Sequence, residues 1–436
     1  MNESNPAEAG VAPAPPRGWA GLVRVAGPGI VVAATGVGAG DLVAAAKAGA
    51  TYGLPVLWTA ALGALLKFAL AEGIGRWQLA TGTTVIEGWG RLLAVPLRAG
   101  FLAYFVLWTI VVAAALMSAC GLAAHALFPG LSVTAWAALH ALAGLAFVWF
   151  GGYRSVEQAM KLFVALMVVA IIGSAALEAP PLAEVIRGLV IPEIPRGGTL
   201  LVMGVVGGIG GTLTLLSYNY WMAEKGWRGA PWARGMRFDL GVGYALTGAF
   251  GLAVIVLGGT VLLPKGVTVS GAKGVLDMAA LLGERLGRGG ELVFLAGFWG
   301  AVFSSLLGVW QGVPYLFGDL AGRLGAHGDA PAGTHVSTRG ARYRGYALFM
   351  TFPPMLLLLL ERPVWLVVAY AATGALFMPF LGATLLYMNN RAELGGLRNG
   401  WLANLALAAS LALFAYLGIH EIREQIVGWM GRPGAF

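Results

Sequence analysis

Long apolar stretches separated by short polar segments dominate the chain. A helix that crosses a bilayer needs about 20 mostly apolar residues. The hydropathy pattern therefore predicts an all-α integral membrane protein with eleven spans. The predicted spans lie near residues 26–50, 54–79, 98–127, 132–151, 158–178, 199–221, 239–263, 291–317, 345–360, 363–388 and 401–419.

Composition supports the membrane assignment. Hydrophobic residues make up 58% of the 436 positions and charged residues only 11%, whereas an ordinary soluble domain carries about 25% charged residues. Soluble enzymes, fibrous proteins and disordered chains are all poor fits, and we expect no enzyme activity. The single cysteine, Cys120, excludes an internal disulfide and a thiolate metal site.

The distribution of basic residues predicts the orientation. If the N-terminus is cytoplasmic, inward segments hold 17 Lys and Arg, outward segments hold 9, and Lys47 and Lys67 lie within helices. This inward excess predicts a multi-pass cell-membrane protein with a cytoplasmic N-terminus. The basic residues are dispersed, which argues against nucleic acid as a partner. We expect the lipid bilayer and a small ion or molecule as partners, with no obligate protein partner evident.

Glycine clusters interrupt two of the predicted spans. Span 1 contains TGVGAGD over residues 35–41, and span 6 contains GGIGGT over residues 207–212. Glycine costs about 1 kcal/mol relative to alanine in a helix. Non-helical backbone at membrane depth is tolerated only where protein buries it or where it lines a cavity. We therefore predict two broken helices, although glycines also mark close helix crossings.

The two breaks lie five spans apart, at corresponding positions of two halves. Because five is odd, the second half is expected to be inverted relative to the first. Matching glycine-interrupted segments of this kind indicate the central site of a secondary transporter. The predicted organisation is a disordered N-terminus, two inverted repeats, an eleventh span and a tail, over residues 1–23, 24–178, 199–388, 401–419 and 420–436.

Several short motifs resemble a known family. Gly27-Pro28-Gly29 leading to Gly40-Asp41, then AGATYG at 48–53 and Trp58, resemble the first two spans of the Nramp divalent-metal transporters. Further matches are Phe303-Ser304-Ser305, Gly318-Asp319 and Pro379-Phe380. The resemblance implies a LeuT-type fold, with an inverted repeat of five plus five helices and an eleventh helix. It also implies that a metal ion is held where the two broken helices meet.

The chain departs from the family at the metal-binding motifs. Where the family has Asp-Pro-Gly-Asn in span 1, residues 38–41 read GAGD, and where it has Met-Pro-His in span 6, residues 211–213 read GTL. Alignment places Ala114 and Met117 at the span 3 positions that carry acids linked to proton passage. It places Ala371 at the glutamine position of span 10. Selectivity for a soft metal therefore has no visible source, because the thioether ligand is missing.

The remaining candidate ligands at the breaks are oxygen atoms. Asp41 is the expected principal ligand of a metal ion, although an aspartate at this position also fits a helix cap. An all-oxygen site with one carboxylate suits a hydrated, hard cation such as Mg²⁺, and it equally suits the ammonium group of an organic solute. The predicted substrate-binding residues are Asp41, Thr35, Gly36, Gly38, Gly207, Gly208, Gly211 and Thr212.

Three charged residues of span 2 form a second group of candidates. Lys67 lies near mid-bilayer, where a charge costs at least about 2.5–3.5 kcal/mol. We expect it either to pair with a buried carboxylate or to take the place of a coupling ion. Glu72 and Arg76 are spaced for an ion pair on one helix face.

The sequence thus predicts a secondary transporter that moves a hard, Mg²⁺-like divalent cation by alternating access, with weak or absent proton coupling. The alternative is a small organic solute, such as an amino acid or amine, on the same scaffold. No resident cofactor is expected. His125 and His140 lack further ligands at metal-binding spacing, so core packing is their expected role.

Overall fold

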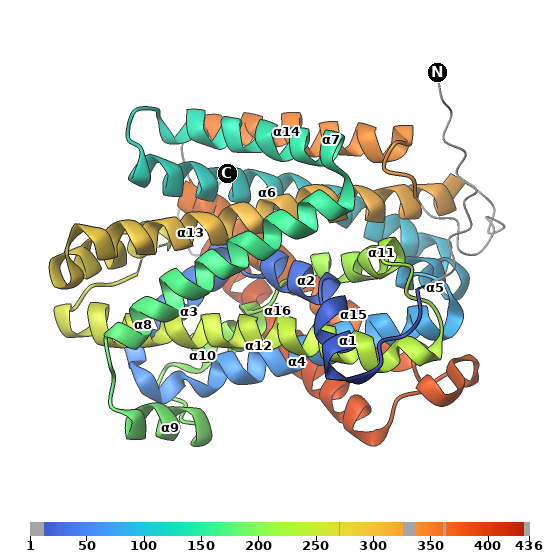
Figure 1. Ribbon diagram of the computed structural model, residues 1–436, viewed down its shortest axis with the longest axis horizontal. Coiled ribbons are helices and arrows are strands. Elements are labelled where there is room, and N and C mark those ends of the chain that lie inside the picture. Colours follow the sequence, from blue (N-terminus) through green and yellow to red (C-terminus); the bar gives the residue numbers. More distant parts are fainter. Residues whose placement is uncertain (1–12, 270, 326–335, 361–362, 431–436) are drawn as a thin grey trace.

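The computed structural model describes residues 13–269, 271–325, 336–360 and 363–430, and the secondary structure within these ranges is entirely helical. Figure 1 shows the helices packed as one bundle, with α2 and α3 passing through its middle. This arrangement agrees with the predicted all-α membrane architecture.

The first span is broken as predicted. It consists of α2 (Pro28–Gly36) and α3 (Ala39–Tyr52), which are separated by Val37 and Gly38. A further helix, α1 (Gly18–Val25), precedes them at an angle of 47° to α2. Most of helix α1 lies within residues 1–23, which were expected to be disordered. Its Leu22 side chain is buried, and the Trp19 ring packs edge-on against Phe238 with centroids 6.0 Å apart. A helix therefore covers part of the segment for which the composition indicates disorder.

Spans 2 to 5 follow, and a sharp turn within one helix separates the last two of them. The elements are η1 (Leu54–Val56), α4 (Trp58–Thr81), α5 (Val85–Leu92), α6 (Val95–Leu127), α7 (Val133–Met167), η2 (Val168–Ile172) and α8 (Gly173–Leu177). Helix α7 reverses direction at Gly152, whose φ of 67° is a conformation that favours glycine. Its two arms, which are visible in Figure 1, correspond to predicted spans 4 and 5.

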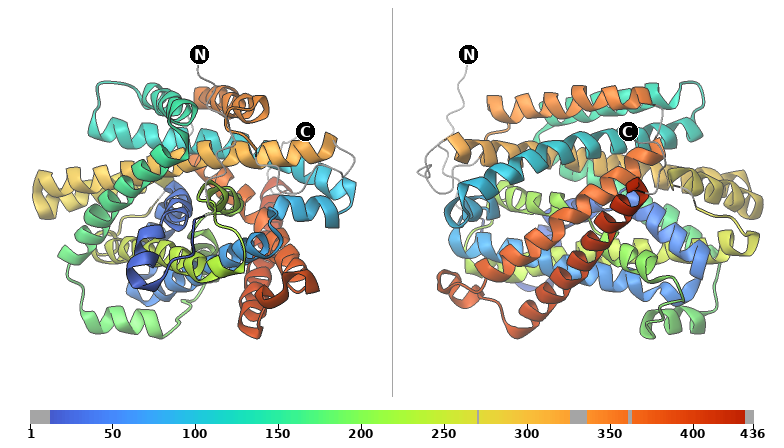
Figure 2. Two further views of the ribbon diagram at one scale, coloured as in Figure 1. Left: turned by 45° about the vertical axis from the view of Figure 1, so that its right-hand side comes forward. Right: turned by 180° about the vertical axis from the view of Figure 1, so that it is seen from behind.

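The second half begins with the other broken helix. After α9 (Leu182–Val190), the chain forms α10 (Thr199–Gly208), an irregular segment over 209–212, η3 (Leu213–Leu216) and α11 (Ser217–Glu224). The helices then continue as η4 (Ala230–Trp232), α12 (Ala233–Leu257), η5 (Gly258–Leu262), η6 (Leu263–Lys265), α13 (Gly271–Gly325), α14 (Ala341–Met355), η7 (Leu356–Leu360), α15 (Pro363–Met388), η8 (Ala392–Leu397) and α16 (Trp401–Met430). Figure 2 shows α15 and α16 side by side across the back of the bundle.

Every predicted span coincides with a helix or with the two halves of a broken helix. By length and apolarity, eight helices in the described ranges can cross a membrane, or nine if the bent pair α1–α2 is counted as one span. The helix over 133–177 holds two of the predicted spans, while the broken α2–α3 and the partly described α15 account for the others. Predicted tail residues 420–430 extend α16, and residues 1–12 and 431–436 lie outside the described ranges.

Close glycine contacts bring α2 and α3 against α12. A methyl group added at Gly243 would lie 2.2 Å from the carbonyl oxygen of Gly29, and one added at Gly49 would lie 2.2 Å from that of Ile255. In lipid, apolar burial drives helix association weakly, so close packing of small residues takes a larger share. These glycines fix how deeply the broken helix lies in the bundle.

Two glycines of α12 allow a matched test of this packing. We expect Gly243→Ala to destabilise the protein by about 1–3 kcal/mol, because the added methyl overlaps the backbone of α2. Gly241→Ala is the control: no atom lies within 4 Å of the added methyl, and alanine favours the helix by up to about 1 kcal/mol. Thermal unfolding in one detergent measures both variants, and equal melting temperatures would contradict the prediction.

Candidate functional site

The two breaks touch each other at the centre of the bundle. A methyl group added at Gly36 would lie 2.6 Å from the carbonyl carbon of Gly210, and one at Gly211 would lie 3.1 Å from the Cα atom of Gly36. Gly210 and Gly211 have φ angles of 93° and 85°, a region that residues with a Cβ rarely adopt. We call this contact between residues 35–41 and 207–212 the junction.

Several backbone groups freed by the first break already have partners. The Ser305 hydroxyl donates to the carbonyl oxygen of Thr35 at 2.7 Å, and the Gly38 N–H donates to that of Gly36 at 3.2 Å. The Thr35 hydroxyl donates to the carbonyl of Val31 at 2.6 Å. The break thus satisfies its exposed polar groups within the protein, as membrane depth requires. Fewer backbone carbonyl oxygens of this break are therefore free to bind a cation than the sequence indicates.

Asp41 connects the two broken helices. It lies in the first turn of α3, where the helix dipole favours a negative charge. Its Oδ2 atom accepts a hydrogen bond from the Gly210 N–H at 3.3 Å, and its Oδ1 atom lies 3.9 Å from a methyl group built at Gly208. The N-cap residue of α3 is Gly38, so Asp41 is not the N-cap, and its carboxylate faces the opposite break.

The other predicted binding residues point in several directions. Within the junction, Gly36 and Gly211 contact the opposite break, and Gly208 faces Asp41. Gly38 and Thr35 face α13, where methyl groups built at Gly38 and Gly308 would meet Ser305 and Thr35. Gly207 lies against Leu417 and Phe414 of α16, and Thr212 lies against Gly374 of α15. The sequence indicates the two segments but not which face each residue presents.

Lys67 reaches the junction from α4. Its side chain is fully buried, and its Nζ atom donates a hydrogen bond to the carbonyl oxygen of Gly211. The same atom lies 3.9 Å from the sulfur of Met378 and 5.1 Å from the ring centroid of Phe414. Among the described residues it forms no direct ion pair with Asp41. Met378 is a thioether near the junction that sequence reasoning missed.

Glu72 and Arg76 form the predicted ion pair. Their Oε2 and Nε atoms are 2.6 Å apart, and Arg237 of α12 contacts the other Glu72 oxygen at 2.9 Å. Arg76 also donates to the carbonyl oxygen of Leu397 at 3.1 Å. This cluster joins α4 to α12 and η8, so the pair binds helices together, whereas Lys67 alone of the three residues reaches the junction.

A second buried acid, Asp239, anchors the start of the first broken helix. Its carboxylate accepts hydrogen bonds from the N–H groups of Gly27 and Gly29 at 2.7 and 2.6 Å and from the Tyr218 hydroxyl at 3.0 Å. The charge sits at the N-terminus of α2, where the helix dipole stabilises it. The only sequence signal was an acid at the start of an apolar span.

The described residues offer few conventional metal ligands. They contain no group of three or more His, Cys, Asp or Glu side chains arranged to hold a metal ion. His125 and His140 instead contact the carbonyl oxygens of Leu131 and Trp136 through their Nδ1 atoms. A cation at the junction would therefore depend on Asp41, backbone oxygens and water.

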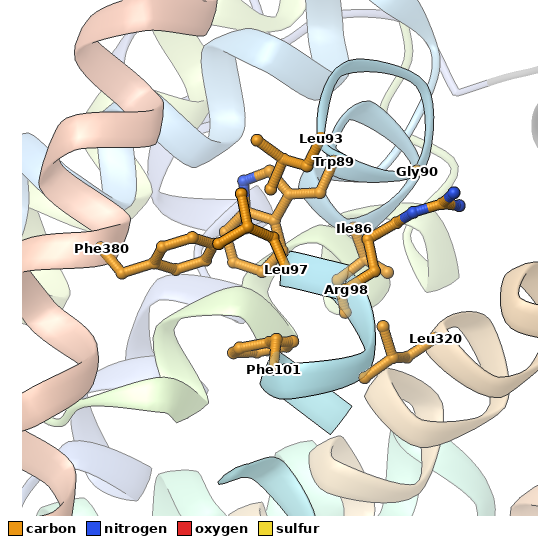
Figure 3. A pocket seen from close by; sticks show the side chains of 9 residues that line it. All are labelled: Ile86, Trp89, Gly90, Leu93, Leu97, Arg98, Phe101, Leu320 and Phe380. Atoms are coloured by element: carbon orange, nitrogen blue, oxygen red, sulfur yellow. The ribbon is translucent and has the colours of Figure 1, made fainter. Parts of the chain in front are cut away.

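A small apolar pocket lies elsewhere in the bundle, between α5, α6, α13 and α15. Figure 3 shows Trp89, Phe101 and Phe380 around it, with the guanidinium group of Arg98 pointing away from these rings. None of the predicted site residues lines it. The residues that line it include no acidic or other polar side chain that would bind a cation, so the junction remains the candidate site.

Adjacent serines of α13 test how the first break is held. We expect Ser305→Ala to cost about 1–3 kcal/mol of stability, because it leaves the buried carbonyl of Thr35 without its donor. Ser304→Ala is the matched control, since Ser304 bonds mainly within its own helix, at 2.9 Å to Ala301, and lies 3.5 Å from the Ala34 carbonyl. Thermal unfolding compares them; a larger loss for Ser304→Ala would contradict this account.

Comparisons with known proteins agree with this architecture. The fold is similar to that of a mutant manganese transporter from Eremococcus coleocola, with a TM-score of 0.77 and 15% identity over 96% of this chain and 91% of that one. The same transporter bound to an aromatic bis-isothiourea substituted compound gives 0.73 and 16% over the same shares. MhsT in complex with L-phenylalanine gives 0.59 and 15%, covering 90% and 97%.

These similarities show a LeuT-type fold, with the inverted five-plus-five repeat and an eleventh helix. No curated protein sequence matches the chain. The family model described as natural resistance-associated macrophage protein-like, or Nramp, matches residues 29–422, which is most of the chain. The protein is therefore a multi-pass membrane transporter rather than an enzyme, and it belongs to the Nramp family.

Proposed function

We propose that this transporter moves a divalent metal cation across the cell membrane, with Asp41 as the principal ligand. The observation that carries the proposal is the position of the Asp41 carboxylate, which lies at the junction and contacts the second break through Gly210. A carboxylate is the natural ligand of a hard cation, and backbone carbonyls and retained water complete such a shell. Family membership and the manganese transporter of the same fold support a metal cargo.

A hard cation such as Mg²⁺ fits the chemistry of the junction better than a soft one. Soft metals favour thioether and thiolate ligands. Gly211 replaces the family's methionine, and Cys120 is buried in α6. The nearby Met378 thioether lies beside the Lys67 amine. Oxygen atoms are therefore the main ligands that the junction presents.

The cation is proposed to cross by alternating access. The breaks divide each helix into halves that can tilt separately, and the junction lies between them. At one end, Asp239 holds the start of α2 against α12, and we propose that opening of the junction at this end releases this contact. The inward excess of basic residues supports a cytoplasmic N-terminus.

Proton coupling is proposed to be weak or absent. The positions where the resemblance places proton-linked acids hold Ala114 and Met117, and both are fully buried in α6. Neither side chain can carry a proton. The two acids of the central region have other roles here, since Asp41 faces the junction and Asp239 anchors α2.

Ion flux into proteoliposomes tests the proposed cargo. We expect Mg²⁺ uptake to exceed that of Mn²⁺, and Asp41→Asn to weaken apparent Mg²⁺ affinity by about tenfold or more, because a charge-assisted contact contributes about 1.5–3 kcal/mol. Asp277→Asn, which removes a carboxylate outside the junction, is the control and should leave uptake unchanged. A folded wild-type protein without flux of Mg²⁺, Mn²⁺ or Ca²⁺ would reject the proposal.

One observation favours a second candidate, a small zwitterion such as an amino acid. The junction holds a carboxylate and an amine, since Asp41 and Lys67 bind adjacent residues of the second break. This pair could bind the ammonium and carboxylate groups of such a solute.

A thermal-shift screen separates the two candidates. If a zwitterion is the cargo, we expect one or more amino acids to raise the melting temperature while the corresponding amides, which lack the carboxylate, have less effect. Stabilisation by divalent metals alone would reject this candidate. Mg²⁺ and Mn²⁺ serve as the comparison in the same plate.

A further inference from the structure

Lys67 has an unusual environment for a charged side chain. It is 0% exposed on a membrane-spanning helix, where a charge is expensive and its presence indicates a function. Lysines near helix ends extend toward water, but this one points into the bundle. The neighbours of its amine come from three elements: the second break, α15 and α16.

Each neighbour of the amine is suited to a cation. The Gly211 carbonyl accepts its hydrogen bond, the Phe414 ring lies 5.1 Å away, and the Met378 sulfur lies at 3.9 Å. A carbonyl dipole and an aromatic face both attract positive charge. These groups form a small binding site for a primary ammonium, which the protein fills with its own side chain.

This ammonium site adjoins the proposed cargo site. Asp41 binds the N–H of Gly210, and Lys67 binds the carbonyl of the next residue, Gly211. Both glycines lack side chains and have positive φ angles, so their backbone is open to both charges. A methyl group at Gly210 would lie 3.2 Å from the Lys67 Cγ atom. The two charged side chains therefore bind adjacent residues of one short segment.

We infer that Lys67 is a tethered cation that occupies the carbonyl side of the second break and thereby limits how tightly the junction holds a cargo cation at Asp41. This inference rests on the proposed function for the identity of the cargo, but the ammonium site is independent of it. The amine takes an oxygen that a metal ion would otherwise use, and its charge repels that ion. A transporter gains from such a limit, because an ion that binds too tightly leaves slowly.

Chemical rescue tests the ammonium site directly. Lys67→Ala removes three methylene groups and the amine, which correspond to n-propylammonium. We expect this variant to melt at a lower temperature than the wild type and to be restabilised by several degrees by millimolar n-propylammonium chloride. The neutral isostere n-propanol should have little effect.

Leu70→Ala, a buried truncation on the same helix, is the matched control and should respond to neither compound. A Lys67→Ala protein that responds equally to amine and alcohol, or to neither, would overturn the inference.

Lys67→Met is the second variant, and it tests the inference if the alanine variant does not fold. This variant retains an unbranched side chain of similar length and loses the charge. We expect it to bind Mg²⁺ about tenfold more tightly than the wild type by calorimetry, which corresponds to about 1.4 kcal/mol. Mg²⁺ binding that is unchanged or weaker in this variant would contradict the inferred effect of Lys67 on the cargo. Absence of Mg²⁺ flux through the wild type would instead reject the proposed function, while propylammonium rescue would still report on the ammonium site.

Discussion

The structure depends on the requirement that backbone groups at membrane depth find partners within the protein. Two helices are broken where they contact each other inside the bundle, and lipid cannot bond to the exposed N–H and carbonyl groups. Each break therefore needs donors and acceptors from elsewhere. Ser305 supplies a donor to the first break, and Asp41 and Lys67 bind the second. The position of the site, its charge and the glycine packing around it follow from this requirement.

The buried charges divide into structural and junction groups. Asp239 holds the start of α2, and Glu72 joins Arg76 to Arg237. Asp41 and Lys67, in contrast, make few hydrogen bonds for buried charged groups. Their charges are opposite, so the junction is close to neutral overall. A neutral junction is cheaper to bury than a charged one, and it leaves any cargo ion to be bound by local contacts rather than by a strong net field.

Much of the fold could be predicted from the sequence, because span length and glycine clusters are local signals. The eleven spans, both breaks and the Glu72–Arg76 pair are examples. Contacts between distant segments have no such signal. Asp239 lies 212 positions from Gly27, and Lys67 lies 144 positions from Gly211. The sequence likewise gives no signal that Gly207 faces α16. The predicted ligand roles remain predictions.

The adjacent positions of Gly210 and Gly211 have a mechanical consequence. Neither residue carries a side chain, so their backbone adopts positive φ angles and accepts close contacts from both sides. Asp41 lies on α3 and Lys67 on α4, so a shift of either helix pulls on the same short segment. The carboxylate and the amine therefore share one segment of two residues. Two helices of the first half are thus tied to each other through the break of the second.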